Sequence, residues 1–156
     1  MYTDSPSESR VVPVCLPWQE TDPGAKLFVG YQTVAAGWGR TTNDKSFIRK
    51  NLQQIKASTD ILMKAIVPAV AKSKCDALDE FKTLNTTVHI CAGGEPGVDS
   101  CNGDSGGPLL YQSIAKTPWF QVGVTSFGTS KCGIGKPGVY NRLSAFLPWI
   151  KENLLP

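Results

Sequence analysis

The residues best suited to chemistry lie between positions 99 and 108, which read DSCNGDSGGP. Ser105 stands between Gly103 and the pair Gly106 and Gly107, so the backbone around its hydroxyl can turn sharply and approach a ligand closely. The N–H groups of Gly103 and Ser105 could then point into one small space and bind a developing oxyanion. The pattern favours a serine nucleophile with its own oxyanion hole over the alternative, an ordinary glycine-rich turn.

The composition indicates a folded domain that can position such a loop. The 156 residues suggest about one domain, and a hydrophobic content of 41% excludes a disordered chain. No apolar run approaches the ~18 residues of a membrane span. The net charge of +3 comes from dispersed Lys and Arg residues, so no basic arm for nucleic acid is expected.

The 15 glycines and 11 prolines are scattered singly, which is typical of turns in an all-β protein. The apolar residues 66–70 are interrupted by Pro68, and residues 69–78 can carry a short helix. We expect six or seven short strands in a barrel or sandwich. The clearest of these strands are at residues 33–38, 52–57, 88–92, 108–111, 119–127 and 138–141.

The end of the chain has a different pattern, which predicts one C-terminal helix. Ser144 is available as its N-cap, and Pro148 falls within about its first turn. The apolar residues at helical spacing are Leu143, Phe146, Leu147, Ile150 and Leu154.

The five cysteines stand at positions 15, 75, 91, 101 and 132, and no two are spaced as CxxC. A zinc or thioredoxin-like site therefore has weak support, and we expect disulfides formed in an oxidising compartment rather than buried free thiols. The odd number leaves one cysteine without a partner in this chain. The first ten residues have no signal-peptide pattern, so we also expect a missing N-terminal part.

The string CNGDSGGPL, at residues 101–109, resembles the nucleophile loop of trypsin-like serine proteases of the chymotrypsin family. Other segments match that family in order and spacing: AGWG at 36–39, ICAG at 90–93, SFG at 126–128, PGVY at 137–140, and the segment 146–150. The chain around PVCLPW, at 13–18, is most similar to arthropod clip-domain proteases of clotting, melanisation and Toll-type cascades.

The resemblance implies a fold and a division of the chain. The fold is all-β: the C-terminal six-stranded Greek-key barrel of the chymotrypsin-like double barrel, followed by a C-terminal helix. On this basis residues 1–30 are the inter-barrel linker, 31–142 the second barrel and 143–156 the helix. The first barrel is expected to be missing, so that the 156 residues form a partial peptidase domain.

The same resemblance implies the roles of the site residues. Ser105 matches the nucleophile, and the N–H groups of Gly103 and Ser105 match the oxyanion hole. Asp99 matches the acid at the base of the specificity pocket, which would favour Arg or Lys before the scissile bond; a solvated loop acid is the alternative. Asp104 matches the acid that pairs with the amino terminus freed by zymogen cleavage. The other substrate-binding positions are Ser126, Gly128 and Gly138.

The resemblance further implies the disulfides Cys75–Cys91 and Cys101–Cys132. Cys15 matches the cysteine that bonds an N-terminal light chain or pro-segment, which accounts for the odd count. Pro137 stands at the position linked to sodium sensitivity in clotting enzymes, where it predicts no sodium site. No metal or cofactor is expected.

The general base is not among these residues. In the family, the catalytic His and Asp both lie before the segment that PVCLP matches, and the only histidine, His89, is expected to be structural or superficial. Because a serine is a weak nucleophile without a base, we expect the chain alone to be an inactive fragment of a secreted endopeptidase. The alternative is a short non-catalytic homologue that acts as a binding module or decoy.

The expected partners are protein substrates with Arg or Lys before the scissile bond, a missing N-terminal segment bonded through Cys15, and serpin-type inhibitors. Neither nucleic acid nor a membrane is expected as a partner. The sequon formed by Asn85, Thr86 and Thr87 is consistent with glycosylation of Asn85 on the surface of a secreted protein.

Overall fold

The structure is a computed structural model, and it describes residues 12–18, 29–41, 58–76, 78, 84–112 and 118–154. Most regular structure is strand, which confirms the all-β prediction. The strands are β1 Thr33–Gly37, β2 Met63–Ile66, β3 Ala69–Val70, β4 His89–Gly93, β5 Pro108–Tyr111, β6 Phe120–Phe127 and β7 Pro137–Arg142. The helices are α1 Lys72–Asp76, the 3₁₀ helix η4 Leu143–Phe146 and α2 Leu147–Leu154.

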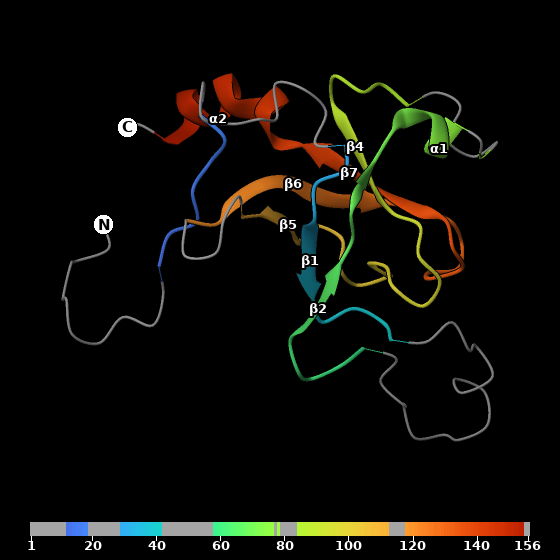
Figure 1. Ribbon diagram of the computed structural model, residues 1–156. Helices are drawn as coiled ribbons and strands as arrows, with labels where there is room; N and C mark the ends of the chain where they lie inside the picture. Colours follow the sequence, from blue (N-terminus) through green and yellow to red (C-terminus); the bar gives the residue numbers. More distant parts are fainter. Residues whose placement is uncertain are drawn as a thin grey trace.

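The strands form one antiparallel sheet in the order β2-β1-β5-β6-β7-β4-β3. Its two end strands are consecutive in the chain, because only Val67 and Pro68 separate β2 from β3. Val67 N donates to the Thr33 carbonyl, and the Pro68 carbonyl accepts from Gly93 N, both at 2.8 Å. The bent segment therefore pairs with β1 on one side and β4 on the other. The sheet closes into the expected barrel of six strand segments, visible as a curled sheet in Figure 1.

The barrel interior is filled by buried side chains from several strands. Leu109 of β5, Val122 of β6 and Tyr140 of β7 are no more than 1% exposed. Burial of each such side chain stabilises the fold by about 1.5–3 kcal/mol. The Thr33 hydroxyl donates to the Val67 carbonyl in this interior, which fixes the bend where the barrel closes.

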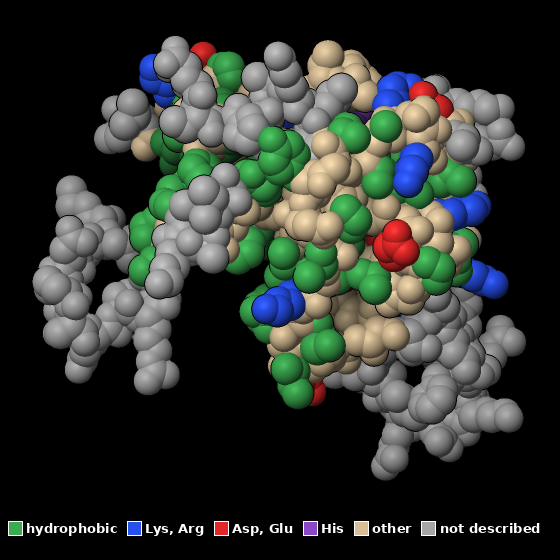
Figure 2. All heavy atoms as spheres, in the orientation of Figure 1, with side chains coloured by type: hydrophobic (Ala, Val, Ile, Leu, Met, Phe, Trp, Pro, Cys, Tyr) green, Lys and Arg blue, Asp and Glu red, His purple; other side chains and the backbone are tan. Residues whose placement is uncertain are grey.

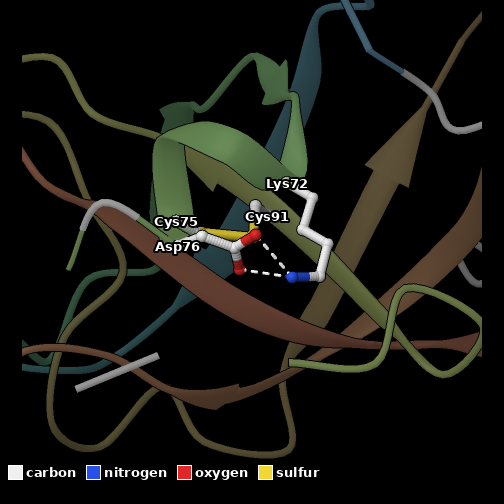
Figure 3. A network of polar contacts seen from close by, with 4 residues as sticks. All are labelled: Lys72, Cys75, Asp76 and Cys91. Atoms are coloured by element: carbon white, nitrogen blue, oxygen red, sulfur yellow. Dashed lines mark hydrogen bonds and ion pairs between the residues drawn. A yellow bond between two sulfur atoms is a disulfide. The ribbon is translucent and has the colours of Figure 1, made fainter. Parts of the chain in front are cut away.

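A second buried cluster holds α1 against the barrel. Cys75 of α1 forms a disulfide with Cys91 of β4 and packs with Leu84 and Val139. Lys72 and Asp76 form an ion pair one helical turn apart, over this disulfide (Figure 3). The helix is thus short, and the disulfide fixes it to β4.

One local prediction is wrong, and one cannot be compared. Ser144 is not a helix N-cap: it lies within η4, and α2 begins only at Leu147. The residue before η4 is Arg142, whose side chain instead donates to the Thr86 and His89 carbonyls and holds the end of β7 against β4. The short helix expected within 69–78 is confirmed as α1, which follows the pairing of β3 with β4. The strand expected at 52–57 lies outside the described residues.

Several large hydrophobic side chains reach the surface near β1 and β2, where Figure 2 shows hydrophobic atoms on the exposed face. The most exposed of these in the described residues are Trp38, Ile61, Leu62, Met63 and Ile66, at 49–73%. None of the helices among the described residues is both long and apolar enough to cross a membrane.

Candidate active site

The carboxylate of Asp104 organises the loop between β4 and β5. Its two oxygens accept hydrogen bonds from Gly39 N at 2.7 Å and from Cys101 N at 2.8 Å. Its backbone closes two turns: Asp104 N donates to the Cys101 carbonyl, and Gly107 N donates to the Asp104 carbonyl. The buried side of the loop is therefore fixed by one side chain, so that the residues on either side of Asp104 face outward.

This arrangement requires glycine at the end of β1. A Cβ atom on Gly37 would lie 2.1 Å from the Asp104 carboxylate, and one on Gly39 would lie 2.4 Å from it. Both distances are too short for any side chain. The two glycines of AGWG are therefore required for steric reasons. Sequence reasoning recognised AGWG as a family motif but did not connect it with Asp104.

Ser105 is exposed at the tip of the same loop. Gly103 has φ +102° and Gly106 has φ +84°, which L side chains rarely adopt. Among the described residues, the N–H groups of Gly103 and Ser105 donate no hydrogen bond. They are thus free to bind an acceptor beside the Ser105 hydroxyl, as an oxyanion hole requires.

Strand β6 supports the loop from the other side. Gly106 N donates to the Thr125 carbonyl and Thr125 N donates to the Gly107 carbonyl, both at 2.9 Å. Ser105 is consequently held between the end of β1, through Asp104, and the middle of β6.

A cavity of about 210 Å³ lies beside Ser105. It brings together all of the predicted substrate-binding residues, although they come from three separate segments of the chain. Its lining includes Asp99, Ser105, Ser126, Gly128 and Gly138. Gly103 is not part of the lining, but its neighbour Asn102 is.

Asp99 is half-buried beside this cavity. Its Oδ2 accepts a hydrogen bond from Gly133 N at 3.0 Å, whereas its Oδ1 is buried with no partner among the described residues. Burial raises the pKa of the Asp99 carboxyl above its ordinary value. Hydrogen bonds from backbone N–H groups, that of Gly133 first, offset part of this rise, whereas the negative charge of Asp104 adds to it. An unpaired buried carboxylate favours a cationic ligand.

Glycines keep the walls of the cavity open. A Cβ atom on Gly138 would lie 3.3 Å from Asp99 Oδ1, and one on Gly128 would lie 3.9 Å from Gly138 Cα. A side chain at either position would narrow the path to Asp99. The two glycines therefore leave a slot that ends at the carboxylate.

A disulfide and a hydrogen bond fix the floor of the slot. The disulfide Cys101–Cys132 joins the segment that carries Asp99 to the opposite wall. The Ser100 hydroxyl lies 2.9 Å from the Tyr140 hydroxyl, inside the barrel. Burial raises the pKa of Tyr140 to about 12, so this hydroxyl stays protonated. Sequence reasoning did not assign Ser100 or Tyr140; the motif PGVY was the available signal.

A second, larger cavity of about 630 Å³ adjoins the loop on its inner side. It lies between β1, β2 and residues 97–104. Asp104, Asp99 and Arg40 are among its lining residues. Asp104 thus faces a space separate from the one that Ser105 lines.

The remaining predicted residues lie elsewhere. His89 does not line the Ser105 cavity; it begins β4, with its ring 5.9 Å from that of Phe127. Asn85 is exposed in a turn, where its Oδ1 accepts from Thr87 N and Thr87 Oγ1. Cys15 is a half-buried free thiol whose backbone bonds the residues on either side of Phe120. Both disulfides join the pairs that the resemblance implies.

A serine in a glycine-rich loop, beside a slot that ends at a carboxylate, fits a serine hydrolase. Comparison with known proteins narrows this class. The family model described as Trypsin matches residues 2–150. The chain therefore belongs to the trypsin family of serine proteases, whose members are hydrolases, and the resemblance drawn from its motifs is confirmed.

The relatives are insect proteases. Melanization protease 1 of Drosophila melanogaster is 39% identical over 149 residues, 92% of this chain and 34% of that protein. CLIP domain-containing serine protease HP8 of Bombyx mori is 37% identical, over 92% of this chain and 36% of that protein. Phenoloxidase-activating enzyme of Bombyx mori is 37% identical, over 97% of this chain and 33% of that protein. The chain spans about a third of the length of these curated relatives.

Proposed function

We propose that this chain supplies the nucleophile, the oxyanion hole and the specificity pocket of a serine endopeptidase that cleaves after Arg or Lys. The observation that carries the proposal is Asp99 Oδ1, a buried carboxylate oxygen without a partner among the described residues, in the cavity that Ser105 lines. A basic side chain that reaches it forms a charge-assisted hydrogen bond. Gly128 and Gly138 leave room for a side chain of that length.

In the proposed reaction, the Ser105 hydroxyl attacks the carbonyl carbon of the bound basic residue. The Oγ–C bond forms, the proton passes to a general base, and the carbonyl oxygen becomes an oxyanion that accepts from Gly103 N and Ser105 N. One such donor contributes roughly 10²–10³ in rate. The amine then leaves with a proton from the same group, and water hydrolyses the acyl-serine.

We assign the general base to a part of the protein outside these residues, because the only histidine, His89, does not line the cavity. Asp104 has a separate proposed role. Its carboxylate faces the 630 Å³ cavity, where it would pair with the amino terminus freed by zymogen cleavage while Gly39 N continues to hold it.

Benzamidine and its neutral isostere benzamide test the proposed specificity. The purified, disulfide-bonded chain is expected to bind benzamidine saturably and benzamide not measurably, because only the amidinium can pair with Asp99. Calorimetric titration of both ligands measures the difference. Equal affinities, or no binding of either ligand, would contradict the proposal.

The chain by itself is expected to show no turnover above background, because without a base the Ser105 hydroxyl is not activated. The measurement is hydrolysis of an arginine ester by the chain and by its Ser105→Ala variant. We expect equal rates. Turnover that Ser105→Ala abolishes would show that these 156 residues contain the base.

The absence of a histidine from the cavity also supports a second candidate, a non-catalytic homologue that binds protease substrates or partners through the same slot. The coding sequence upstream of residue 1 separates the two. An in-frame activation site and a histidine motif would favour the protease, whereas a stop codon and a promoter would favour the binding module.

We propose an extracellular location and a place in a proteolytic cascade, with serpin-type inhibitors as regulators. The two disulfides support an oxidising compartment, and the names of the relatives refer to melanization and to phenoloxidase activation. In this setting Cys15 bonds an N-terminal segment and the exposed Asn85 carries a glycan.

A further inference from the structure

His89, the only histidine of the chain, carries a buried nitrogen that the proposed reaction does not use. Its Nδ1 has no hydrogen-bond partner among the described residues. Its ring meets the ring of Phe127 edge-to-face, with the centroids 5.9 Å apart and the planes at 83°. Phe127 lines the 210 Å³ cavity and stands between Ser126 and Gly128. His89 therefore contacts a wall of that cavity without lining it.

The register of the sheet explains why the two rings meet. Ile90 belongs to the barrel core, so its neighbours His89 and Cys91 lie on the opposite face of β4. Val139 of β7 lies opposite Cys91 on one side and opposite Phe127 on the other. The contact between the two rings therefore crosses β7 outside the barrel, on the face that carries the disulfide to α1.

The charged groups around His89 are mostly cations. Arg142 of β7 is 7% exposed and donates to the His89 carbonyl at 3.2 Å. Lys72 of α1 lines the same small crevice as His89 and Arg142. The carboxylate of Asp76, also on α1, already pairs with Lys72 (Figure 3). Strand β6 contributes Phe127, which is uncharged. Among these described groups, no free carboxylate is available to a charged imidazole.

Protonation therefore disturbs the position of this ring. Histidine is the side chain whose charge ordinarily changes between pH 5 and 8, and both nitrogens of the charged ring donate. At Nδ1 the added proton would be a buried donor without an acceptor, near the Arg142 guanidinium. Such a donor is costly when it belongs to a charged group, and the ring lowers the cost by turning toward water. This movement breaks the contact with Phe127.

We propose that His89 is a positioning residue that makes the slot sensitive to pH: its neutral ring holds Phe127 in place, and its protonation releases Phe127 and weakens ligand binding in the slot. This inference rests on the proposed function, because it concerns the ligand of the same slot. Loss of one aromatic contact of this kind corresponds to a change in affinity of about 5-fold.

Benzamidine titrations of the disulfide-bonded chain at about pH 7.5 and about pH 5.5, on either side of the ordinary histidine range, test the inference. His89→Phe is the matched control, because it keeps an aromatic ring that cannot take up a proton. Between the two pH values, the affinity of the unmodified chain should fall about 5-fold more than that of His89→Phe. Asp99 is present in both proteins, so its own titration cancels in this comparison.

Phe127→Leu provides a second comparison, because it removes the ring contact and leaves His89 in place. Its affinity for benzamidine should change with pH as that of His89→Phe does. A Phe127→Leu variant that keeps the full pH dependence of the unmodified chain would show that His89 does not act through Phe127, and the inference would be wrong.

NMR of the unmodified chain gives a readout that needs no variant, because its one imidazole Hε1 resonance follows the protonation of His89. By linkage, saturating benzamidine must move the midpoint of this titration to lower pH. A midpoint that benzamidine leaves unchanged, or equal pH dependence of the unmodified chain and His89→Phe, would overturn the inference. In either case, benzamidine binding that depends on Asp99 would leave the proposed function intact. If the unmodified chain does not bind benzamidine at neutral pH, the proposed function fails and the inference fails with it.

Discussion

Replacement of Asp99 by asparagine is expected to weaken benzamidine binding about 100-fold or more. The amidinium would enter a buried slot and find a neutral amide in place of the carboxylate, and removal of one partner of a buried ion pair costs about 3–5 kcal/mol. The two side chains have nearly the same shape, so the cavity keeps its size. Calorimetric titration of both proteins gives the ratio of the dissociation constants.

Glu95→Gln is the control for this experiment, because it removes an exposed charge from the same stretch of chain. It should change the affinity less than 2-fold, as expected for a solvated charge. Benzamidine affinities of Asp99→Asn and the unmodified chain that agree within threefold would show that Asp99 is not the pocket acid.

The affinity should also depend on pH. Burial raises the pKa of Asp99 above 3.8, so protonation on acidification removes the charge at a higher pH than for an ordinary carboxyl. Benzamidine binding should weaken as the pH falls through this pKa, and Asp99→Asn should not show the change. Because the folded-state pKa is raised, the ligand-free chain gains stability from this group at low pH and loses it as the pH rises.

Removal of the disulfide Cys101–Cys132 by paired serine substitutions is expected to lower the free energy of unfolding by roughly 3–4 kcal/mol. The bond closes a loop with a sequence separation of 31 residues, and this figure follows from the entropy that the cross-link removes from the unfolded chain. Denaturant unfolding measures the loss. Both cysteines line the cavity, so benzamidine affinity should fall as well.

The other disulfide provides the comparison. Cys75–Cys91 has a sequence separation of 16 residues and joins α1 to β4 without lining the Ser105 cavity. Its removal should lower stability by roughly 3 kcal/mol but leave benzamidine affinity unchanged under folding conditions. If both double variants lose affinity to the same extent, the loss comes from partial unfolding and not from the position of Asp99.

The strands and the glycine-rich turns around Ser105 could be predicted from the sequence because their causes are local. The apolar residues of β6 and the glycines around Ser105 each act within a few positions. The resemblance predicts a barrel, but the bend that closes it could not be predicted, because it depends on Pro68, whose carbonyl accepts a hydrogen bond from Gly93 N of the neighbouring strand β4. Ser144 was misassigned as an N-cap because it lies within η4; the residue before η4 is Arg142, whose side chain bonds carbonyls 56 and 53 residues away in the chain.

The candidate site divides in a similar way. The residues predicted to bind substrate were named from family motifs, and all of them line one cavity in the structure. The contact between the Asp104 carboxylate and Gly39 spans 65 residues. This contact does not follow from the spacing of residues along the chain.

A crystal structure of the disulfide-bonded chain with bound benzamidine tests the central claim most directly. The account predicts the amidinium in the 210 Å³ cavity, with a nitrogen within about 3 Å of Asp99 Oδ1 and the ring between Gly128 and Gly138, below Ser105. A ligand bound elsewhere on the chain, with Asp99 Oδ1 still unpaired, would contradict the claim that this slot receives a basic side chain.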